Sequence, residues 1–410
     1  MILDRDARLI FTTRGLRMFG YGLVSVVLVL YLAALHIPDA QIGILLSFTL
    51  LGDAAISLWL TTHADRVGRR KVLLAGSLLM AAAGLGFAAS SSLWVLLIAA
   101  TIGVISPSGN EVGPFLAVEQ AAMSQTIPDD RRTGVFAWFN LTGSFATAAG
   151  ALAGGSLATG LVSAGYSQVD AYRAVIVGYA IIALGLAFLF SRVSPNVEAP
   201  EAPEVSVARR LGLHRSQKTV ARLSALFALD AFGGGFVVQS LIAYWFHLRF
   251  GADPAVIGLA LFGANIVAGL SALSAAWIAA RIGLIRTMVF THLPSNVLLI
   301  MVPLMPTLPL AVAVLLLRFS ISQMDVPTRQ SYTMAVVDPD ERSAAAGVTG
   351  IARSIGASIS PLAAAPLIGG VALAGAPFIL AGGLKITYDL ALYRAFKAVR
   401  PEHESPGPRT

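Results

Sequence analysis

The lysines and arginines of this chain gather at alternate ends of long apolar segments, and this pattern constrains the fold more than any other feature. Of the 29 basic residues, all but eight lie on the even-numbered connections between about twelve apolar segments or on the two tails. Such an excess on one side orients a chain that crosses a bilayer many times, with the basic side cytoplasmic. We therefore predict a multi-pass protein of the inner (cytoplasmic) membrane with both termini inside. The eight exceptions are Arg173 and Arg249 at the opposite ends, and Arg14, Arg17, Arg318, Arg329, Arg353 and Lys385 inside segments.

Composition agrees with a lipid environment and excludes several classes of protein. Hydrophobic residues make up 56% of the chain and charged residues 12%, with a mean hydropathy of +0.76, far from the balance of soluble proteins. The net charge of +7 follows from the basic bias, and no basic run alternates with aromatic residues, so no nucleic acid partner is expected. The chain has no cysteine, and its six histidines show no metal-ligand spacing. We expect no metal and no cofactor.

Each apolar segment is long enough to cross a hydrocarbon core, which takes about 20 residues. The predicted fold is an all-α integral membrane protein with twelve transmembrane helices in two pseudo-symmetric six-helix bundles. Pro107, Pro114, Pro327 and Pro361 fall inside segments and are expected to bend them. The predicted spans are residues 11–34, 41–62, 71–90, 93–126, 134–163, 171–191, 221–248, 255–278, 287–305, 310–336, 343–371 and 376–397.

A polar, proline-rich stretch divides the chain into two similar halves. Residues 193–220 are interpreted as a cytoplasmic linker between an N-terminal bundle, 1–192, and a C-terminal bundle, 221–400, and residues 401–410 as a disordered cytoplasmic tail. Ile42-Gly43 recurs as Ile257-Gly258 at an offset of 215, and Pro-Asp-Asp-Arg at 128–131 recurs as Pro-Asp-Glu-Arg at 339–342. Shared order and offset indicate a tandem duplication in one membrane orientation.

The second inner connection carries a recognisable motif. Residues 64–71, Ala-Asp-Arg-Val-Gly-Arg-Arg-Lys, resemble the signature loop of the major facilitator superfamily, G-x-L-A-D-R-x-G-R-R/K, although Thr61 and His63 replace its leading glycine and leucine. With twelve spans, a central linker and a duplication, the resemblance covers essentially the whole chain. It implies a carrier of small solutes that works by alternating access.

The same resemblance implies a conformational latch at Asp65, Arg66, Gly68 and Arg69. In this family the aspartate faces the start of the eleventh helix and the arginine pairs with an acid, so Asp65 and Arg69 are expected to do the same. A carboxylate near a helix N-terminus is favourable in itself. The alternative is a solvated basic turn that only sets topology.

Glycines in the fifth segment give a second resemblance. Residues 150–155, Gly-Ala-Leu-Ala-Gly-Gly, are similar to the G-P-x-x-G-G stretch of antiporters in that superfamily, with Ala151 in place of proline. This implies a drug/proton antiporter-like member and outward transport. Small residues also let helices approach closely, so packing by Gly143, Gly150, Gly154 and Gly155 is the alternative. The fourth segment lacks the arginine that many members carry, which opposes their usual scheme of proton coupling.

Six acids lie at spanning depth with the six intramembrane bases. An unpaired charge in this position costs at least a few kcal/mol, so pairing or a wet cavity is expected. The tenth segment places five polar residues on one helical stripe, predicted to face the cavity between the halves. The resemblance implies that the first, fourth, seventh and tenth helices line the path. The predicted substrate and proton pathway comprises Arg17, Tyr21, Glu111, Glu119, Asp230, Arg318, Ser322, Asp325, Arg329 and Tyr332.

Ion pairing suggests how coupling would work. We hypothesise that Asp325 pairs with Arg329 or Arg318 without substrate, and that protonation or substrate binding breaks the pair; a permanent structural salt bridge is the alternative. Lys385 and Asp389, at i and i+4, are expected to form an internal ion pair.

The predicted function is secondary active transport of a small organic solute by alternating access, as proton-coupled efflux. The protein is expected to be a monomer. One alternative is an uptake symporter or uniporter for an organic anion, suggested by the arginines of the first and tenth helices. Another is a non-transporting membrane sensor or assembly factor. An enzyme is not expected, because no pair of nucleophile and base stands out.

Overall fold

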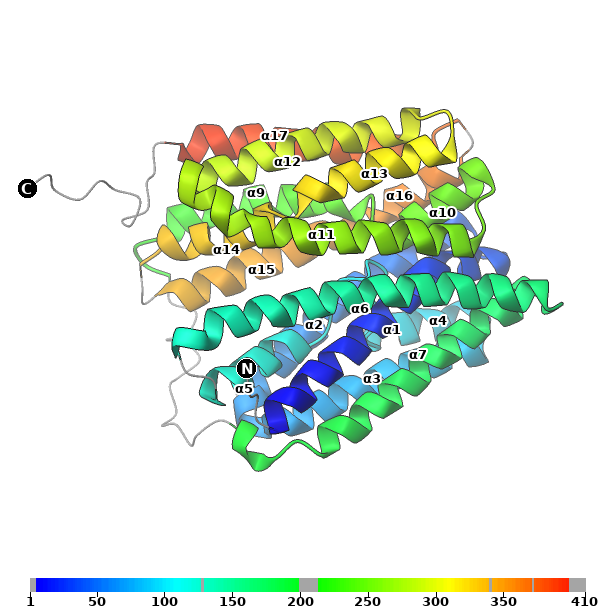
Figure 1. The fold of residues 1–410 in the computed structure, drawn as a ribbon, viewed down its shortest axis with the longest axis horizontal. Coiled ribbons are helices and arrows are strands. Elements are labelled where there is room, and N and C mark those ends of the chain that lie inside the picture. The colour runs from blue at the N-terminus through cyan, green and yellow to red at the C-terminus, as the bar shows by residue number, and fades with distance from the viewer. Residues whose placement is uncertain (1–4, 127–128, 199–212, 339–340, 371, 398–410) are drawn as a thin grey trace, which may run out of the picture. The chain divides into compact units, whose positions relative to one another are not determined.

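The computed structural model describes residues 5–126, 129–198, 213–338, 341–370 and 372–397, and these residues form helices joined by short connections (Figure 1). Ten helices in the described part are long and apolar enough to cross a membrane. Two further helical regions complete the set of twelve predicted spans: the interrupted fourth span, and α17, Ala376–Phe396, which carries the charges of Lys385 and Asp389. The twelve-helix prediction is therefore compatible with the structure. The predicted tail, half of the linker and the repeated Pro-Asp signals at 128 and 339–340 lie outside the described residues.

The prediction of one continuous helix over residues 93–126 is wrong. α4, Leu93–Ile102, ends at Gly103, and α5, Phe115–Thr126, begins after an irregular stretch, which we call the 103–114 segment. Pro107 and Pro114 bring no N–H to a helix, and Gly109 and Gly113 adopt φ of +67° and +80°, which few other residues tolerate. The two prolines therefore accompany a break rather than a bend.

Three other predicted spans are also broken. The seventh divides at residues 236–238, the tenth at 323–324 and the eleventh at Ser360, where Pro361 starts a new helix. Pro327 lies in the first turn of the second part of the tenth span. The parts are α9, Gln217–Gly235, and α10, Gln239–Phe250; α13, Leu308–Ser322, and α14, Asp325–Ala335; α15, Arg342–Ile359, and α16, Pro361–Gly369.

The chain forms two compact units. The first comprises Met1–Glu201, Val238–Ile266 and Pro361–Ala374, and the second comprises Ala202–Val237, Val267–Ser360 and Gly375–Thr410, within the described residues. The predicted linker and bundle boundaries stay predictions. The remaining helices are α1, Arg5–Ala34, α2, Asp39–Val67, α3, Arg69–Ala89, α6, Asp129–Ser163, α7, Gln168–Ser191, α11, Pro254–Ile282, and α12, Leu284–Met301, with short 3₁₀ turns at Pro195–Val197 and Val302–Leu304.

In the first unit, α1 is the most buried helix, and it packs along α6 and α7 (Figure 1). Glycines allow the closest approach: a Cβ on Gly22 of α1 would lie 2.0 Å from the carbonyl oxygen of Thr147, and one on Gly150 of α6 would lie 2.0 Å from that of Phe19. Apolar transfer does not hold helices together in lipid, so this backbone contact is a large part of what does.

In the second unit, α9 packs against α15 and α17, and α12 against α13, α14 and α17. A buried apolar cluster, which includes Phe227, Met288, Tyr332, Tyr388 and Leu392, holds these helices together. Charged side chains from the same helices lie beside this cluster, and they form one of the two sites described next.

Candidate functional site

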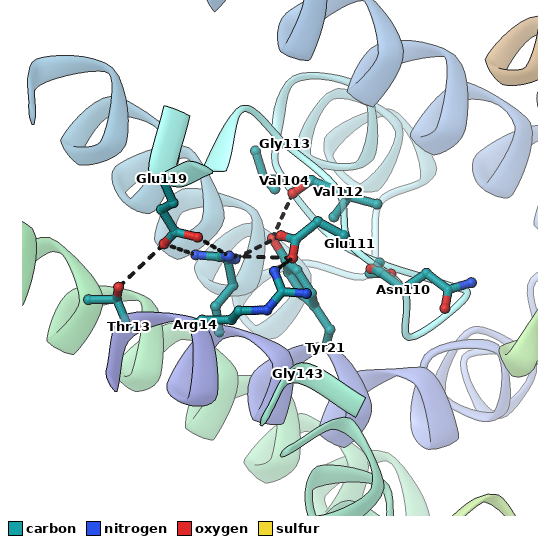
Figure 2. Close-up of polar contacts among 12 residues, drawn as sticks. Thr13, Arg14, Tyr21, Val104, Asn110, Glu111, Val112, Gly113, Glu119 and Gly143 are labelled. Carbon is teal, nitrogen blue, oxygen red and sulfur yellow. Dashed lines mark hydrogen bonds and ion pairs between the residues drawn. The ribbon is translucent and has the colours of Figure 1, made fainter. Parts of the chain in front are cut away.

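Four charged residues of the first unit form what we call the first ion cluster: Arg14 and Arg17 of α1, Glu111 of the 103–114 segment and Glu119 of α5 (Figure 2). Arg17 Nη1 lies 2.7 Å from Glu119 Oε1, and Arg17 Nε lies 2.9 Å from Glu111 Oε1. Arg14 Nη1 donates to the other oxygen of Glu111, and Arg14 Nε donates to the Phe139 carbonyl at 2.7 Å. Arg17 and Glu119 are fully buried. Two bases thus face two acids, and each charge has an opposite partner.

The backbone of the 103–114 segment is tied down by side chains from other helices. Tyr21 donates to the Val112 carbonyl at 3.1 Å, and Tyr179 donates to that of Val104. The Gly113 N–H donates to Asp53 Oδ1 at 2.6 Å. Irregular backbone is tolerated at membrane depth only where such partners or water satisfy it. The exposed side chain of Asn110 points away from the ion cluster in Figure 2.

Six residues of the second unit form what we call the second ion cluster: Asp230 of α9, His292 of α12, Asp325 and Arg329 of α14, and Lys385 and Asp389 of α17. Asp230 is its centre, because Oδ1 lies 2.6 Å from Lys385 Nζ and Oδ2 lies 3.1 Å from Arg329 Nη1. The same Arg329 nitrogen lies 3.0 Å from Asp325 Oδ2. The predicted pairing of Asp325 with Arg329 is thus present, and Arg329 bridges two carboxylates.

His292 joins Asp389 to this centre. Its Nδ1 lies 2.9 Å from Asp389 Oδ1, and its Nε2 lies 3.9 Å from Asp230 Oδ1. Asn296, one turn along α12, donates to Asp389 Oδ2 at 2.9 Å. The predicted ion pair between Lys385 and Asp389 is therefore wrong: Lys385 reaches across to α9, and Asp389 is held by α12. The i,i+4 spacing allowed the pair, but a buried acid on a neighbouring helix was the stronger partner.

Arg318 and Arg353 lie near the second ion cluster without joining it. Neither guanidinium makes a hydrogen bond or an ion pair with any residue that the structure describes, and the Nε of each is buried. Arg318 stacks on Phe319, with its Cζ 4.7 Å from the ring centre. The electrostatic influence of Asp230 and Asp325 reaches both arginines.

The predicted stripe on the tenth span is only partly a polar site. Asp325 and Arg329 lie in the second ion cluster, whereas Tyr332, two turns into α14, packs in the apolar cluster with Phe396. Ser322 is buried at the last residue of α13. The break at residues 323–324 interrupts the helix that was expected to align all five side chains.

At the signature loop, Asp65 and Arg69 pair with each other. Arg69 Nε lies 2.9 Å from Asp65 Oδ1, and Gly68 adopts φ of +104° between α2 and α3. Glu198, which the sequence analysis did not single out, accepts hydrogen bonds from the backbone N–H groups of Arg69, at 2.6 Å, and Arg70, at 3.2 Å. This carboxylate caps the N-terminus of α3. Arg66 is exposed, and the latch itself stays a prediction.

The glycines of α6 lie at tight contacts. A Cβ on Gly154 would lie 2.4 Å from the Leu23 carbonyl oxygen, and one on Gly155 would lie 2.1 Å from that of Pro254. Gly143 faces the Arg14 guanidinium, whose Nε would lie 2.9 Å from such a Cβ. These glycines therefore fit the packing interpretation, and Gly143 leaves room for the first ion cluster.

Sequence reasoning missed two polar residues of these sites, His292 and Asn296. Asp53 and Arg353 were recognised as intramembrane charges but were not assigned to the predicted pathway. A signal existed for His292 and Asn296, which lie one turn apart inside an apolar span where polar residues are costly. No group of three or more His, Cys, Asp or Glu residues suited to a metal ion occurs in the described part of the chain.

An all-helical chain with long apolar spans and buried ion clusters is a multi-pass membrane protein. Residues 10–361 match the family model described as Major Facilitator Superfamily, and the chain belongs to this superfamily. Members of this superfamily are transporters that need no cofactor, and so we describe this protein as a transporter of small molecules in a lipid bilayer and not as an enzyme.

Relatives and solved structures agree with this assignment. An uncharacterized membrane protein of Saccharomyces cerevisiae is 30% identical over 426 residues, which cover 97% of this chain and 95% of the relative. The structure of the nucleoside transporter NupG matches with a TM-score of 0.74 and 13% identity over 96% of this chain and 100% of that one. The structure of a D-xylose-proton symporter matches with a TM-score of 0.70 and 14% identity over 95% and 97%. At such identities the likeness to solved structures shows the fold alone.

Proposed function

We propose that this transporter moves a small organic solute outward across the cytoplasmic membrane by alternating access, as a monomer with both termini inside, and that proton entry drives it. The observation that supports coupling most directly is the second ion cluster. Three carboxylates and a histidine lie there within 2.6 to 3.9 Å of one another or of a base, inside membrane-spanning helices. Ionisable groups at this depth are costly and typically mark ion or substrate pathways.

The geometry suggests how one proton would change the cluster. A proton that reaches His292 makes it an imidazolium, which competes with Arg329 and Lys385 for Asp230. A proton on Asp230 or Asp325 weakens the hold on Arg329, which then has one anionic partner instead of two. Either event changes which helices among α9, α12, α14 and α17 are held together by charge. Such a change biases the balance between two conformations.

Outward direction is supported by the antiporter-like glycine stretch of α6. Its contacts are also explained by helix packing alone. The measured sign of flux therefore decides between efflux and the uptake alternative.

The test uses purified protein in proteoliposomes that enclose a pH-sensitive dye. D-xylose, uridine and succinate are supplied singly, under an imposed pH gradient and then under its reverse. We expect at least one solute to move against the proton flux, and the flux to change sign when the gradient is reversed. Asp325→Asn should abolish gradient-driven transport while solute exchange without a gradient continues, because exchange needs no net proton movement.

Asp170→Asn is the matched control, since Asp170 is an exposed acid at the start of α7 that pairs with Arg173 and accepts a hydrogen bond from Ser167, outside both ion clusters. Its transport should equal that of the wild type. Normal coupling in Asp325→Asn would exclude Asp325 from the mechanism. Movement of solute and protons in the same direction would replace efflux by uptake, and solute flux indifferent to the gradient would refute proton coupling.

A further inference from the structure

The second unit contains two arginines, one buried (Arg318) and one partly buried (Arg353), whose Nε atoms have no hydrogen-bond partner among the described residues. Arg318 lies one turn before the break between α13 and α14, and Arg353 lies in α15. The Nε atoms of both are buried without a hydrogen-bond partner. A guanidinium is an obligate cation with five N–H donors, so it is costly at membrane depth unless an acceptor is supplied.

The neighbouring carboxylates are already engaged. Asp325 binds Arg329, Asp230 binds Arg329 and Lys385, and Asp389 accepts from His292 and Asn296. Four permanent or ordinarily charged bases, Arg318, Arg329, Arg353 and Lys385, therefore face three carboxylates. Because the field of Asp230 and Asp325 reaches both Arg318 and Arg353, all of these groups share one electrostatic environment. Among the described residues, this environment therefore holds one more base than it holds carboxylates.

We infer that Arg318 and Arg353 bind the anionic group of the transported solute, a small organic anion with a carboxylate or a phosphate. This inference rests on the proposed function, because it names the substrate class of the same transporter. An arginine presents two parallel N–H groups that match a carboxylate or a phosphate, which is why arginines without protein acceptors suit this ligand.

The first ion cluster argues that the unpaired arginines are a specific feature. Arg14 and Arg17, also at membrane depth, have acids placed against them. The same chain thus neutralises arginines where pairing is structural. The sequence suggested that arginines of the first and tenth helices hold an organic anion. The structure changes this suggestion, because Arg353 of the eleventh span, and not an arginine of the first helix, is the second arginine of the proposed site.

Binding is measured on the full-length protein in a neutral detergent, at constant pH and ionic strength and without a gradient. The probes are succinate and citrate as carboxylates, glycerol 3-phosphate as a phosphate, uridine as a neutral solute, and chloride. We expect one organic anion to raise the thermal midpoint in a saturable way, since a ligand that binds only the folded state stabilises it. Arg318→Gln and Arg353→Gln should each weaken its affinity about tenfold or more.

Two further variants guard the interpretation. Arg318→Lys keeps the charge but loses the paired donors, so it should fall between the wild type and Arg318→Gln. Arg281→Gln removes an arginine that lies over Trp277 at the exposed end of α11, and it should leave affinity unchanged. Circular dichroism and a monodisperse elution peak establish that each variant is folded.

Several results would overturn the inference. The thermal midpoint would not shift with any organic anion, both glutamine variants would show the same shift as the wild type, or chloride would shift the midpoint as much as the organic anions do. The experiments also separate failure of this inference from failure of the proposed function. Anion binding without proton-linked flux would refute coupling and retain the site. Proton-linked flux of a neutral solute that Arg318→Gln leaves intact would retain the function and refute the site.

Discussion

The two ion clusters differ in how completely the charges in and around them are paired, and this difference suggests that the first supports the structure and the second serves transport. In the first, Arg14 and Arg17 face Glu111 and Glu119, and every charge has an opposite partner within hydrogen-bonding distance. In the second, Asp230, Asp325 and Asp389 each have a partner, but two neighbouring arginines have no acceptor among the described residues. A balanced cluster can hold helices in one arrangement. A region with unpaired arginines is suited to bind an anionic ligand or to respond to a proton.

This contrast suggests a division of labour within the chain. The first ion cluster ties α1 to the 103–114 segment and α5, and it makes a broken fourth span tolerable at membrane depth. The second ion cluster joins α9, α12, α14 and α17 through ion pairs and hydrogen bonds that include a histidine. We therefore expect opposite results when an arginine is removed from each region.

The largest effect is expected for Arg17→Met. Among the described residues, the variant leaves the buried Glu119 with Thr13 alone as a hydrogen-bond partner, and removal of one member of a buried pair costs about 3–5 kcal/mol. Thermal unfolding in detergent should show a much lower midpoint and a poor yield of folded protein.

The double variant Arg17→Met with Glu119→Leu checks the cause. Because well-packed apolar residues often replace a buried ion pair without loss, it should recover much of the stability. A double variant as unstable as Arg17→Met would mean that packing of the long side chain, and not its charge, is what matters.

The second prediction tests how α6 supports the same cluster. Gly143→Ala places a methyl group 2.9 Å from Arg14 Nε, so the guanidinium must shift, which disturbs the bond from Nε to the Phe139 carbonyl and the bond from Nη1 to Glu111. We expect a loss of about 1–3 kcal/mol, as for other overpacked sites. Gly160→Ala lies in the same helix with open space around it, and better helix propensity should make it neutral or slightly stabilising. Equal midpoints for both variants would contradict the proposed role of Gly143.

Much of the fold followed from the sequence because the bilayer imposes simple rules. Apolar length predicted the spans, since it does not depend on which helices touch. The basic residues at alternate ends predicted the orientation of the spans, and that orientation stays a prediction. The breaks were harder to place. Ser106-Pro107-Ser108-Gly109-Asn110 combines residues that favour turns, yet its position inside an apolar stretch favoured a bent helix.

The site was predicted less well because its contacts join residues far apart in the chain. Asp325 and Arg329 were found together, since helix geometry alone makes them neighbours. Lys385 has a possible partner at i+4, Asp389, but it pairs with Asp230, which lies 155 residues away in the sequence. Which face of a helix meets which neighbour is decided by packing, and a single sequence does not encode that in any local spacing.

The third prediction is the opposite of the first, because here the removal of an arginine should not lower the stability of the protein. Arg318→Met removes a buried cation that has no hydrogen-bond acceptor or acid partner among the described residues, so the empty protein should keep its stability or gain up to about 2 kcal/mol. The measurement is the thermal midpoint without ligand. Destabilisation similar to that of Arg17→Met would show that Arg318 is held by attractions comparable to those of the first ion cluster, and the contrast between the two regions would disappear.

The smallest effect concerns Glu341, which lies outside the membrane-spanning helices of the second unit. Burial raises the pKa of this carboxyl, but hydrogen bonds from the backbone N–H groups of Arg215, His214 and Ser216 outweigh it and lower the pKa from 4.5 to about 2. A lowered pKa in the folded state stabilises the protein above pH 4.5, and this contribution is lost as the pH falls toward 2.

The thermal midpoint of the wild type should therefore exceed that of Glu341→Gln at neutral pH, and the gap should narrow steadily below about pH 4.5. Glu198 offers the comparison in the first unit: it also caps a helix, but with two backbone hydrogen bonds instead of three, so Glu198→Gln should cost less at neutral pH. Asp170→Asn, at an exposed acid, should leave the acid dependence unchanged. A gap between wild type and Glu341→Gln that stays constant from pH 7 to pH 3 would show that the ionised carboxylate is not what joins the loop before α9 to the start of α15.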